Sequence, residues 1–245
     1  MMTKAAMPFL AVCLSFLLFV PPAGAQSAET GGRSAREVLA IGWQAGYCAA
    51  RPKSKGCVSF SADAPAARQF SLVGRWQPRQ SYCGIEAGLK QRARKGKWID
   101  LPELALAAGT KERLATAMPA VRVGLDRQQW LRSGSCVAAS PEAYYGRSLD
   151  MLDQINASPL PALFAERAGG TVTLAEVRAA FDAAFGQGAG ERVRLACRKV
   201  GENQVVTGLT IGLGAGEGTL ATLIGASGPT RSRCEAGLTG AVRGG

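Results

Sequence analysis

The chain has 245 residues, of which 47% are hydrophobic, and it carries a formal net charge of +11 without a single histidine. This length predicts one sizeable domain with its own hydrophobic core. The positive charge either serves solubility alone or attracts polyanions such as nucleic acid, anionic lipid headgroups or acidic envelope polymers. A zinc site is disfavoured, because neither a C-x-x-C pair nor a histidine is present to supply ligands.

Residues 1–25 have the pattern of a signal peptide. Lys4 gives a short positive region, residues 5–20 are almost wholly apolar, and Ala23-Gly24-Ala25 supplies the small residues that a signal peptidase accepts. The apolar run is shorter than the roughly 20 residues that a membrane-spanning helix needs. We therefore expect export to the periplasm or the extracellular space, with a mature domain over residues 26–245. That domain has a net charge of +10 without Lys4, and no membrane span is predicted in it.

Six cysteines remain in the predicted mature chain. In an exported protein they predict three disulfides, because the compartment is oxidising. Six cysteines can pair in many ways, and the sequence alone does not choose among them. They are Cys48, Cys57, Cys83, Cys136, Cys197 and Cys234.

Two strands are predicted near the start of the domain. Residues 37–43 (EVLAIGW) form the first, and a turn-rich stretch carrying Cys48 and Cys57 follows it. Residues 69–76 (QFSLVGRW) form the second strand, because their side chains alternate in hydrophobicity. The residues that share one face of this strand are Phe70, Leu72 and Gly74.

The middle of the chain predicts a basic loop and two helices. Residues 90–97 (KQRARKGK) are expected to form an exposed loop, and residues 101–117 a helix. Ser140-Pro141 predicts the start of the next helix, which runs from about residue 142 to 155, because proline is favoured at the first helical position. The apolar side of that helix is formed by Tyr145, Leu149 and Leu152.

The last part of the chain predicts one helix, a strand pair and a glycine-rich tail. Thr173 and Glu176 form a capping box, which begins a helix. Residues 192–199 and 204–213 predict two strands joined by the turn at 201–203. Because strands and helices are interspersed without regular βαβ alternation, the fold class is α+β with a mainly antiparallel central sheet. The apolar stripe of the capped helix, expected in the core, is Leu174, Val177, Phe181 and Phe185.

Three stretches, in this order, resemble motifs of the ribonuclease T2 family. Residues 38–48 (VLAIGWQAGYC) are similar to the family's opening strand, which leads into a tryptophan and a Y/F-C pair. Residues 70–76 (FSLVGRW) resemble its first active-site motif, F-x-x-H-G-L-W-P. Residues 125–136 (LDRQQWLRSGSC) resemble the second, H-E-W-x-K-H-G-T-C. The resemblance spans most of the mature chain and implies a ribonuclease T2-like fold, with helices flanking the sheet. It also implies the disulfides Cys48–Cys57, Cys83–Cys136 and Cys197–Cys234, the last of which would hold the tail.

The motifs depart from the family at the catalytic positions. In the family, one imidazole takes the proton of the attacking 2′-hydroxyl, another protonates the leaving 5′-oxygen, and no metal is needed. Here Val73 stands at the first-motif histidine, Gln128 and Ser133 at the second-motif histidines, and Gln129 at the glutamate. Arg132 replaces the lysine and is the surviving cation, able to hold a phosphate.

These replacements predict a pseudoenzyme. Each positioned acid or base contributes roughly 10²–10⁴-fold, so losing both removes most of the acceleration. We expect an exported protein that binds RNA or another polyanion, without cofactor or metal. Stacking on aromatic rings together with cations on phosphates holds single strands without sequence readout. The candidates for such contacts are Arg75, Trp76, Trp130 and Arg132. Alternatively, the two tryptophans are core residues and Arg75 pairs with a nearby carboxylate.

Two other hypotheses stay open. The chain could be an endoribonuclease, cleaving RNA through a 2′,3′-cyclic phosphate with Asp126, Arg132 and Arg75. It could also be a protein-interaction module with a closed cleft, which Val73 favours because an apolar residue suits a packed or protein-binding surface. An open basic groove would argue against that module.

Overall fold

The computed structural model describes residues 1–2, 34–58 and 60–241, and the predicted signal peptide, apart from its first two residues, lies outside the described residues. The described strands form a six-stranded sheet in the order β2-β1-β5-β6-β3, with β4 also paired to β5. All pairs are antiparallel except β5 with β6. The strands are β1 (Glu37–Gly42), β2 (Ser71–Trp76), β3 (Thr171–Thr173), β4 (Val193–Val200), β5 (Asn203–Leu213) and β6 (Ala236–Leu238).

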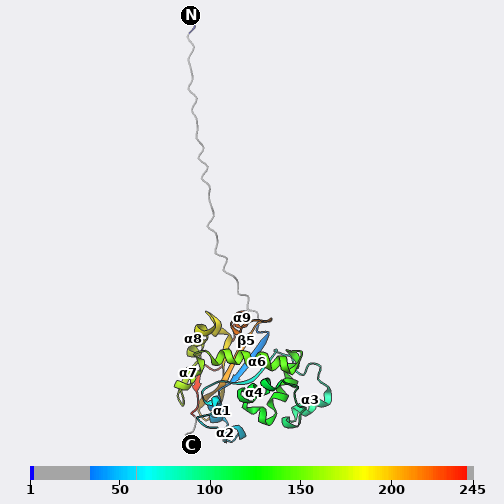
Figure 1. Cartoon of the computed structure of the whole chain (residues 1–245). Coiled ribbons are helices and arrows are strands. Elements are labelled where there is room, and N and C mark those ends of the chain that lie inside the picture. Colours follow the sequence, from blue (N-terminus) through cyan, green and yellow to red (C-terminus); the bar gives the residue numbers. More distant parts are fainter. Residues whose placement is uncertain (3–33, 59, 242–245) are drawn as a thin grey trace.

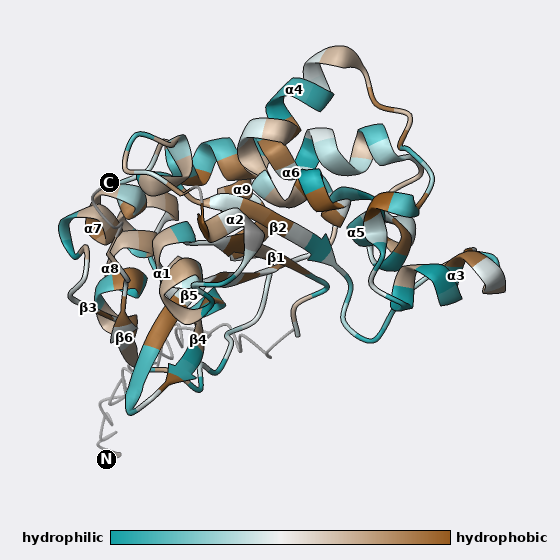
Figure 2. Ribbon diagram, turned by 90° about the horizontal axis from the view of Figure 1, so that it is seen from below, coloured by the Kyte–Doolittle hydropathy of each residue, from teal (hydrophilic) through white to brown (hydrophobic). Residues whose placement is uncertain are grey.

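Helices flank this sheet, which confirms the predicted α+β class and mainly antiparallel sheet (Figure 1). The longest of them, α6, crosses in front of the sheet and buries Tyr144, Tyr145, Leu149 and Leu152. Hydrophobic positions gather on the central strands, while the turn joining β4 and β5 is hydrophilic (Figure 2). The helices are α1 (Gln44–Ala50), α2 (Lys55–Val58), α3 (Ala87–Arg94), α4 (Ala108–Ala117), α5 (Leu125–Arg132), α6 (Pro141–Asn156), α7 (Leu160–Glu166), α8 (Leu174–Phe185) and α9 (Leu220–Gly225).

The elements with strong local signals form as predicted. Thr173 and Glu176 make both hydrogen bonds of the capping box that begins α8. The β4–β5 hairpin turns at residues 201–202, and β1, β2 and α6 lie within one or two residues of their predicted bounds. All three expected disulfides are present, with Cα–Cα distances of 5.2 Å, 5.0 Å and 6.2 Å for Cys48–Cys57, Cys83–Cys136 and Cys197–Cys234.

Two predicted irregular stretches are helical. Residues 44–50 form α1 rather than turns, and Gly46 lets this helix pack directly on β5: a Cβ at Gly46 would lie 1.9 Å from the carbonyl oxygen of Val206. The basic run predicted as a loop lies mostly in α3. Glu86 caps that helix by accepting from the Gly88 amide at 3.2 Å, and buried Ala93 anchors its inner face. Lysine, arginine and glutamine are good helix formers, so a run of charged residues is compatible with a helix as well as with a loop.

Two other predictions were partly wrong: one helix is shorter than expected, and the glycine-rich tail contains more secondary structure than expected. The helix expected over residues 101–117 begins only at Ala108, because Arg127 binds the extended segment before it, donating to the carbonyl oxygens of Ile99 and Leu101 at 2.6 Å and 2.7 Å. The glycine-rich tail is held by more than Cys234. It contains α9, and β6 pairs with β3 and β5.

Candidate functional site

The two motif segments meet where α5 lies against β2. The side chain of Gln129 rests on Gly74, where an added Cβ would lie 2.7 Å from Gln129 Oε1. A larger residue at position 74 would therefore displace the Gln129 side chain from this contact. The fold thus brings together two segments that lie more than 50 residues apart in the sequence.

The ends of α5 are fixed by their neighbours. Gly124 starts the helix in the left-handed conformation, with φ of 77°, and its Cα lies directly on the backbone of Trp98. At the other end, the Cys83–Cys136 disulfide ties the loop after β2 to the segment after α5, and the Tyr82 amide donates to the carbonyl oxygen of Arg132 at 2.8 Å. The loop after β2 and the end of α5 therefore form one connected wall.

Two neighbouring hollows open beside this wall. The first, which we call the Trp76 hollow, has a volume of about 450 Å³. The second, which we call the Trp98 hollow, has a volume of about 320 Å³. Ser81 and Arg132 line both. The Trp76 hollow is also lined by Trp76, Gln77, Arg79, Gln80, Gln129 and Ser133, and the Trp98 hollow by Tyr82, Ala93, Arg94, Trp98 and Gln128.

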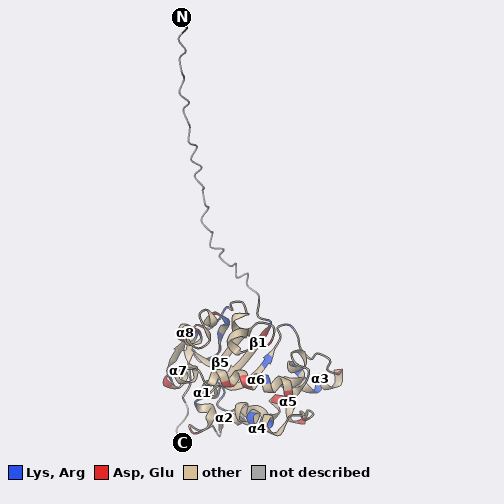
Figure 3. Cartoon of the chain, turned by 45° about the horizontal axis from the view of Figure 1, so that its top comes forward, with Lys and Arg blue, Asp and Glu red and all other residues tan. Residues whose placement is uncertain are grey.

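Arg132 is the cation that faces both hollows. It is exposed, and it forms no ion pair with any described residue. Two further cations lie over the ring of Tyr82, which lines the Trp98 hollow. Lys90 Nζ is 5.6 Å and Arg94 Cζ 5.4 Å from the ring centroid. The hollows therefore combine positive charge with aromatic rings, and α3 extends the positive charge outward (Figure 3).

The lining of both hollows is poor in groups that transfer protons. Its ionisable side chains are three arginines and Tyr82, and none of them is a carboxylate, lysine or thiol. The lining therefore lacks the histidines, carboxylates, lysines and thiols that most often transfer protons in enzymes. The arginines that contribute are Arg79, Arg94 and Arg132.

The family's catalytic positions come together only in part. Gln129, Arg132 and Ser133 line the Trp76 hollow, whereas Gln128 lies in the Trp98 hollow on the other side of Arg132. Val73 lines neither hollow. It is the extra residue of a bulge between β1 and β2, half-buried, with Cγ2 lying 3.3 Å from where a Cβ on Gly42 would stand.

Arg75 does not face the hollows, which corrects its place among the RNA-binding candidates. Only 2% of the residue is exposed, and its guanidinium forms an ion pair with Glu37. Nε donates to Ser148 Oγ at 3.4 Å, and Cζ lies 5.4 Å from the ring centroid of Tyr144. The structure confirms the alternative interpretation, in which Arg75 pairs with a carboxylate, here that of Glu37.

Tyr144 holds the backbone of β2 at the same place. Its hydroxyl donates to the carbonyl oxygen of Arg75 at 2.8 Å and accepts from the Arg75 amide at 2.7 Å. Burial raises the pKa of Tyr144 to about 12, so this hydroxyl keeps its proton at ordinary pH. The buried arginine and the tyrosine together fix the strand that leads to Trp76.

The two candidate tryptophans differ. Trp76 is half-buried and lines a hollow. Trp130 lines neither hollow. It packs against both hydrophobic clusters of the protein, with its ring centroid 6.1 Å from that of Tyr144. Trp130 is therefore a packing residue, as the alternative interpretation held.

Asp126 lies apart from the hollows. It is 8% exposed and lines a separate pocket with Leu104, Leu114 and Glu103. Burial raises the pKa of this carboxyl, and Oδ1 has no hydrogen-bond partner. The endoribonuclease hypothesis grouped Asp126, Arg132 and Arg75, but the structure places them in a side pocket, at the hollows and in the core respectively.

Sequence reasoning missed the loop after β2 and the aromatic residues beyond it. Arg79 and Tyr82 both have left-handed backbone conformations, with φ of 66° and 58°. Such conformations are uncommon for residues other than glycine and gather at functional sites. The available signal was the polar stretch between Trp76 and Cys83. The residues missed are Gln77, Arg79, Gln80, Ser81, Tyr82 and Trp98.

Two searches of the described residues were negative. Within residues 34–58 and 60–241, no three histidine, cysteine, aspartate or glutamate side chains are grouped to hold a metal ion. Among the helices in these ranges, none has the length and apolar character required to cross a membrane.

Comparison with known proteins finds ribonucleases among the chains similar to this one. No protein-family model matches the sequence. Ribonuclease I of Escherichia coli (strain K12) is 25% identical over 198 residues, which cover 71% of this chain and 74% of that protein. Among solved structures, the SF11-RNase of Nicotiana alata, associated with gametophytic self-incompatibility, has a TM-score of 0.53 at 14% identity and covers 84% of this chain and 97% of its own. A mutant of bitter gourd ribonuclease MC1 has a TM-score of 0.52 at 15% identity, covering 82% and 98%.

Proposed function

We propose that this chain, which is related to the ribonuclease T2 family and has its fold, is an exported protein that binds single-stranded RNA without cleaving it. One observation carries the proposal. Arg132 lies unpaired among the described residues, between two hollows with aromatic walls, and the lining of those hollows holds no histidine, carboxylate, lysine or thiol. The site therefore keeps binding chemistry and lacks proton-transfer chemistry.

The loss of catalysis follows from the replaced positions. Val73 cannot accept or donate a proton, and the amides of Gln128 and Gln129 do not titrate. Ser133 is 6% exposed and has no neighbouring base in the hollow lining to activate its hydroxyl. Arginine at position 132 can stabilise a charged phosphate but cannot move its proton.

The binding proposal rests on the arrangement of cations and rings. Trp76 and Tyr82 are half-buried, each with part of its surface open to a hollow, and bases can stack on such faces. Arg132, which lines both hollows, is placed to hold a phosphate between two neighbouring nucleotides. The basic residues of α3 would attract the backbone beyond them.

Two observations bear on the remaining parts of the proposal. Hollows of about 450 Å³ and 320 Å³ argue against a cleft filled by the protein's own side chains, which weakens the protein-interaction alternative. The three disulfides are consistent with an oxidising compartment outside the cytoplasm, which supports export.

The experiment is a binding titration with fluorescently labelled single-stranded RNA at low salt, followed by anisotropy. Arg132→Gln and Trp76→Ala should each weaken binding by about tenfold, the loss expected when one phosphate or one stacking contact is removed. Arg198→Gln removes an exposed arginine from β4 and serves as the matched control, because it should leave the affinity almost unchanged.

The salt dependence gives a second readout. Arg132→Gln should reduce the slope of log affinity against log salt by about 0.7, since a contact to one phosphate of a single strand is lost. No binding of RNA at low salt would contradict the proposal. Equal binding of RNA and heparin, unaffected by Trp76→Ala, would leave only a general attraction to polyanions.

A further inference from the structure

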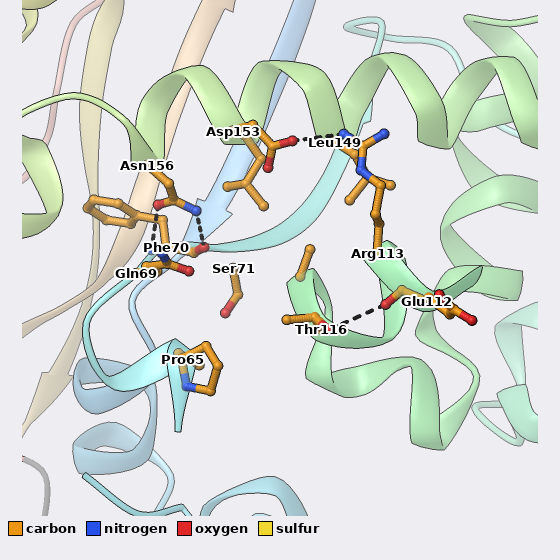
Figure 4. A pocket seen from close by; sticks show the side chains of 13 residues that line it. Pro65, Gln69, Phe70, Ser71, Glu112, Arg113, Thr116, Leu149, Asp153 and Asn156 are labelled. Carbon is orange, nitrogen blue, oxygen red and sulfur yellow. Dashed lines mark hydrogen bonds and ion pairs between the residues drawn. The ribbon is translucent and has the colours of Figure 1, made fainter. Parts of the chain in front are cut away.

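Helix α4 has a pocket on each of two opposite sides. On the side that faces α6, the pocket has a volume of about 370 Å³, and the arginine that lines it is already paired, since Arg113 Nη2 lies 2.8 Å from both Asp150 Oδ1 and Asp153 Oδ2 (Figure 4). On the side that faces α5, a pocket of about 320 Å³ is lined by Asp126. This α4–α5 pocket shares no lining residue with the two hollows, so it is separate from the proposed RNA site.

The walls of the α4–α5 pocket are mainly apolar and are held by the core. Leu114 is buried in the main hydrophobic cluster, and Leu104, Leu106 and Val121 are half-buried and pack against the same cluster. The pocket is therefore formed before any ligand arrives. Its volume lies at the lower end of the roughly 300–1,000 Å³ that is typical of small-molecule sites, which favours a small ligand.

Asp126 places a carboxyl group without a partner in these walls. The residue is 8% exposed, and its Oδ1 is buried with no hydrogen-bond partner among the described residues, although buried polar atoms nearly always have one. The Tyr145 hydroxyl donates to the backbone carbonyl oxygen of Asp126 at 2.6 Å and holds the residue in place. Burial raises the pKa of this carboxyl, and the amides at the start of α5 offset only part of that effect. When it is ionised, the carboxylate lacks the counter-charge that a buried charge normally has.

The neighbouring charged side chains do not supply that counter-charge. Arg127 donates to two backbone carbonyl oxygens and, at 3.2 Å, to Glu103 Oε1. Lys111 lines the pocket but is exposed, and it forms no ion pair with any described residue. Because Glu103 is paired with Arg127, Asp126 is left as a single carboxylate among apolar side chains, whereas a calcium or magnesium ion takes about six oxygen ligands. An organic cation is the better match.

We propose that the α4–α5 pocket binds a small primary amine with an apolar body, in its ammonium form. The ammonium donates a hydrogen bond to the Asp126 carboxylate and supplies the missing counter-charge. The apolar body lies against Leu106, Leu114 and Val121. A neutral alcohol of the same shape would bring a hydrogen bond without the charge, and an anion would be repelled by the buried carboxylate.

The test is a titration of the mature protein, with its disulfides intact, by two-dimensional amide NMR at pH 7. Benzylamine is the probe, and benzyl alcohol is its uncharged equivalent of the same shape. Benzylamine should bind saturably, with a Kd of about 1 mM or lower, and shift the amides of Leu106, Ala115 and Arg127. Benzyl alcohol should bind at least about tenfold more weakly, because its hydrogen bond is not assisted by charge.

Three variants separate this site from a general surface effect. Asp126→Asn should weaken benzylamine binding at least about tenfold, and it should fold normally because it keeps the shape of the side chain and removes a buried charge. Lys111→Gln should leave the affinity unchanged or raise it by about twofold, since it removes a like charge from the pocket lining. Glu202→Gln, which changes an exposed carboxylate in the β4–β5 turn, is the matched control and should change nothing.

The proposal is overturned if benzylamine shows no saturable binding below about 10 mM, if benzyl alcohol binds equally well, or if Asp126→Asn binds like the natural protein. A clear loss of binding in Lys111→Gln would also contradict it, because the lysine and not the carboxylate would then hold the ligand. RNA affinity should be the same in Asp126→Asn as in the natural protein, so none of these results depends on whether the chain binds RNA.

Discussion

The ion pair between Arg75 and Glu37 gives a test of the structure, because removing either partner should cost a different amount of unfolding free energy. The side chain of Arg75 is 3% exposed and that of Glu37 18%. Removing the carboxylate leaves a buried guanidinium without its counter-charge, which typically costs about 3–5 kcal/mol of unfolding free energy. Because Ser148 Oγ and the Tyr144 ring still contact the arginine, we expect Glu37→Gln to cost about 3 kcal/mol, near the lower end.

The reverse change should be much milder. Arg75→Leu places an apolar side chain in the same apolar surroundings, and water can still reach the partly exposed Glu37. We expect a loss of about 1 kcal/mol, since the charge left behind is the partly exposed carboxylate, which water can solvate, and not a buried one. For a domain of this size, the difference of about 2 kcal/mol corresponds to roughly 4–8 °C in melting midpoint.

The assay is urea unfolding of the disulfide-bonded protein, followed by tryptophan fluorescence, for both single variants and the double variant Glu37→Gln with Arg75→Leu. RNA affinity is measured on the same samples, and Arg75→Leu should leave it unchanged because Arg75 lies in the core. Equal, small losses of stability for both single variants would refute the burial argument. A marked loss of RNA binding in Arg75→Leu would restore that residue to the binding site.

Three further predictions concern groups around the site. Asp126→Asn should stabilise the protein by about 1 kcal/mol at pH 7 by removing a buried charge whose Oδ1 has no partner. Because burial raises the pKa of Asp126 in the folded state, the natural protein gains stability as pH falls from that raised value toward 3.8, and urea titrations at several pH values should show the advantage of the variant shrinking there. Tyr144→Phe should cost about 2 kcal/mol in urea unfolding, because it leaves both backbone groups of Arg75 without their partner. Replacing Cys83 and Cys136 by serine should cost about 2–5 kcal/mol and also weaken RNA binding in the anisotropy assay, whereas unchanged affinity would show that the loop after β2 plays no part.

The sequence predicted those parts of the fold whose signals are local. The Thr173–Glu176 capping box, the β4–β5 hairpin and the amphipathic face of α6 each depend on residues within a few positions of one another. The helix α3 was missed because its run of basic residues was interpreted as an exposed loop, although the same residues have high helix propensity. The packing of α1 on β5 through Gly46 joins residues about 160 positions apart and leaves no signal in the local sequence.

The same distinction holds for the site. The motif residues Gln129, Arg132 and Ser133 were found because their spacing is local, and the structure brings them to one hollow. The role of Arg75 could not be read from its own motif, since its partner Glu37 lies on the neighbouring strand. The separation of Asp126 from Arg132 follows from the helical geometry of α5, which turns residues six positions apart to different sides.

The central claim is that the protein has the ribonuclease T2 fold without its chemistry, and RNA cleavage tests it most directly. End-labelled single-stranded RNA is incubated with the purified mature protein, with and without EDTA, and read on a denaturing gel beside the triple reversion Val73→His, Gln128→His and Ser133→His. We predict no cleavage by the natural protein above the buffer blank, and any cleavage by the reversion would show that the site is otherwise intact. Cleavage by the natural protein that persists through repurification and disappears in Arg132→Gln would contradict the account.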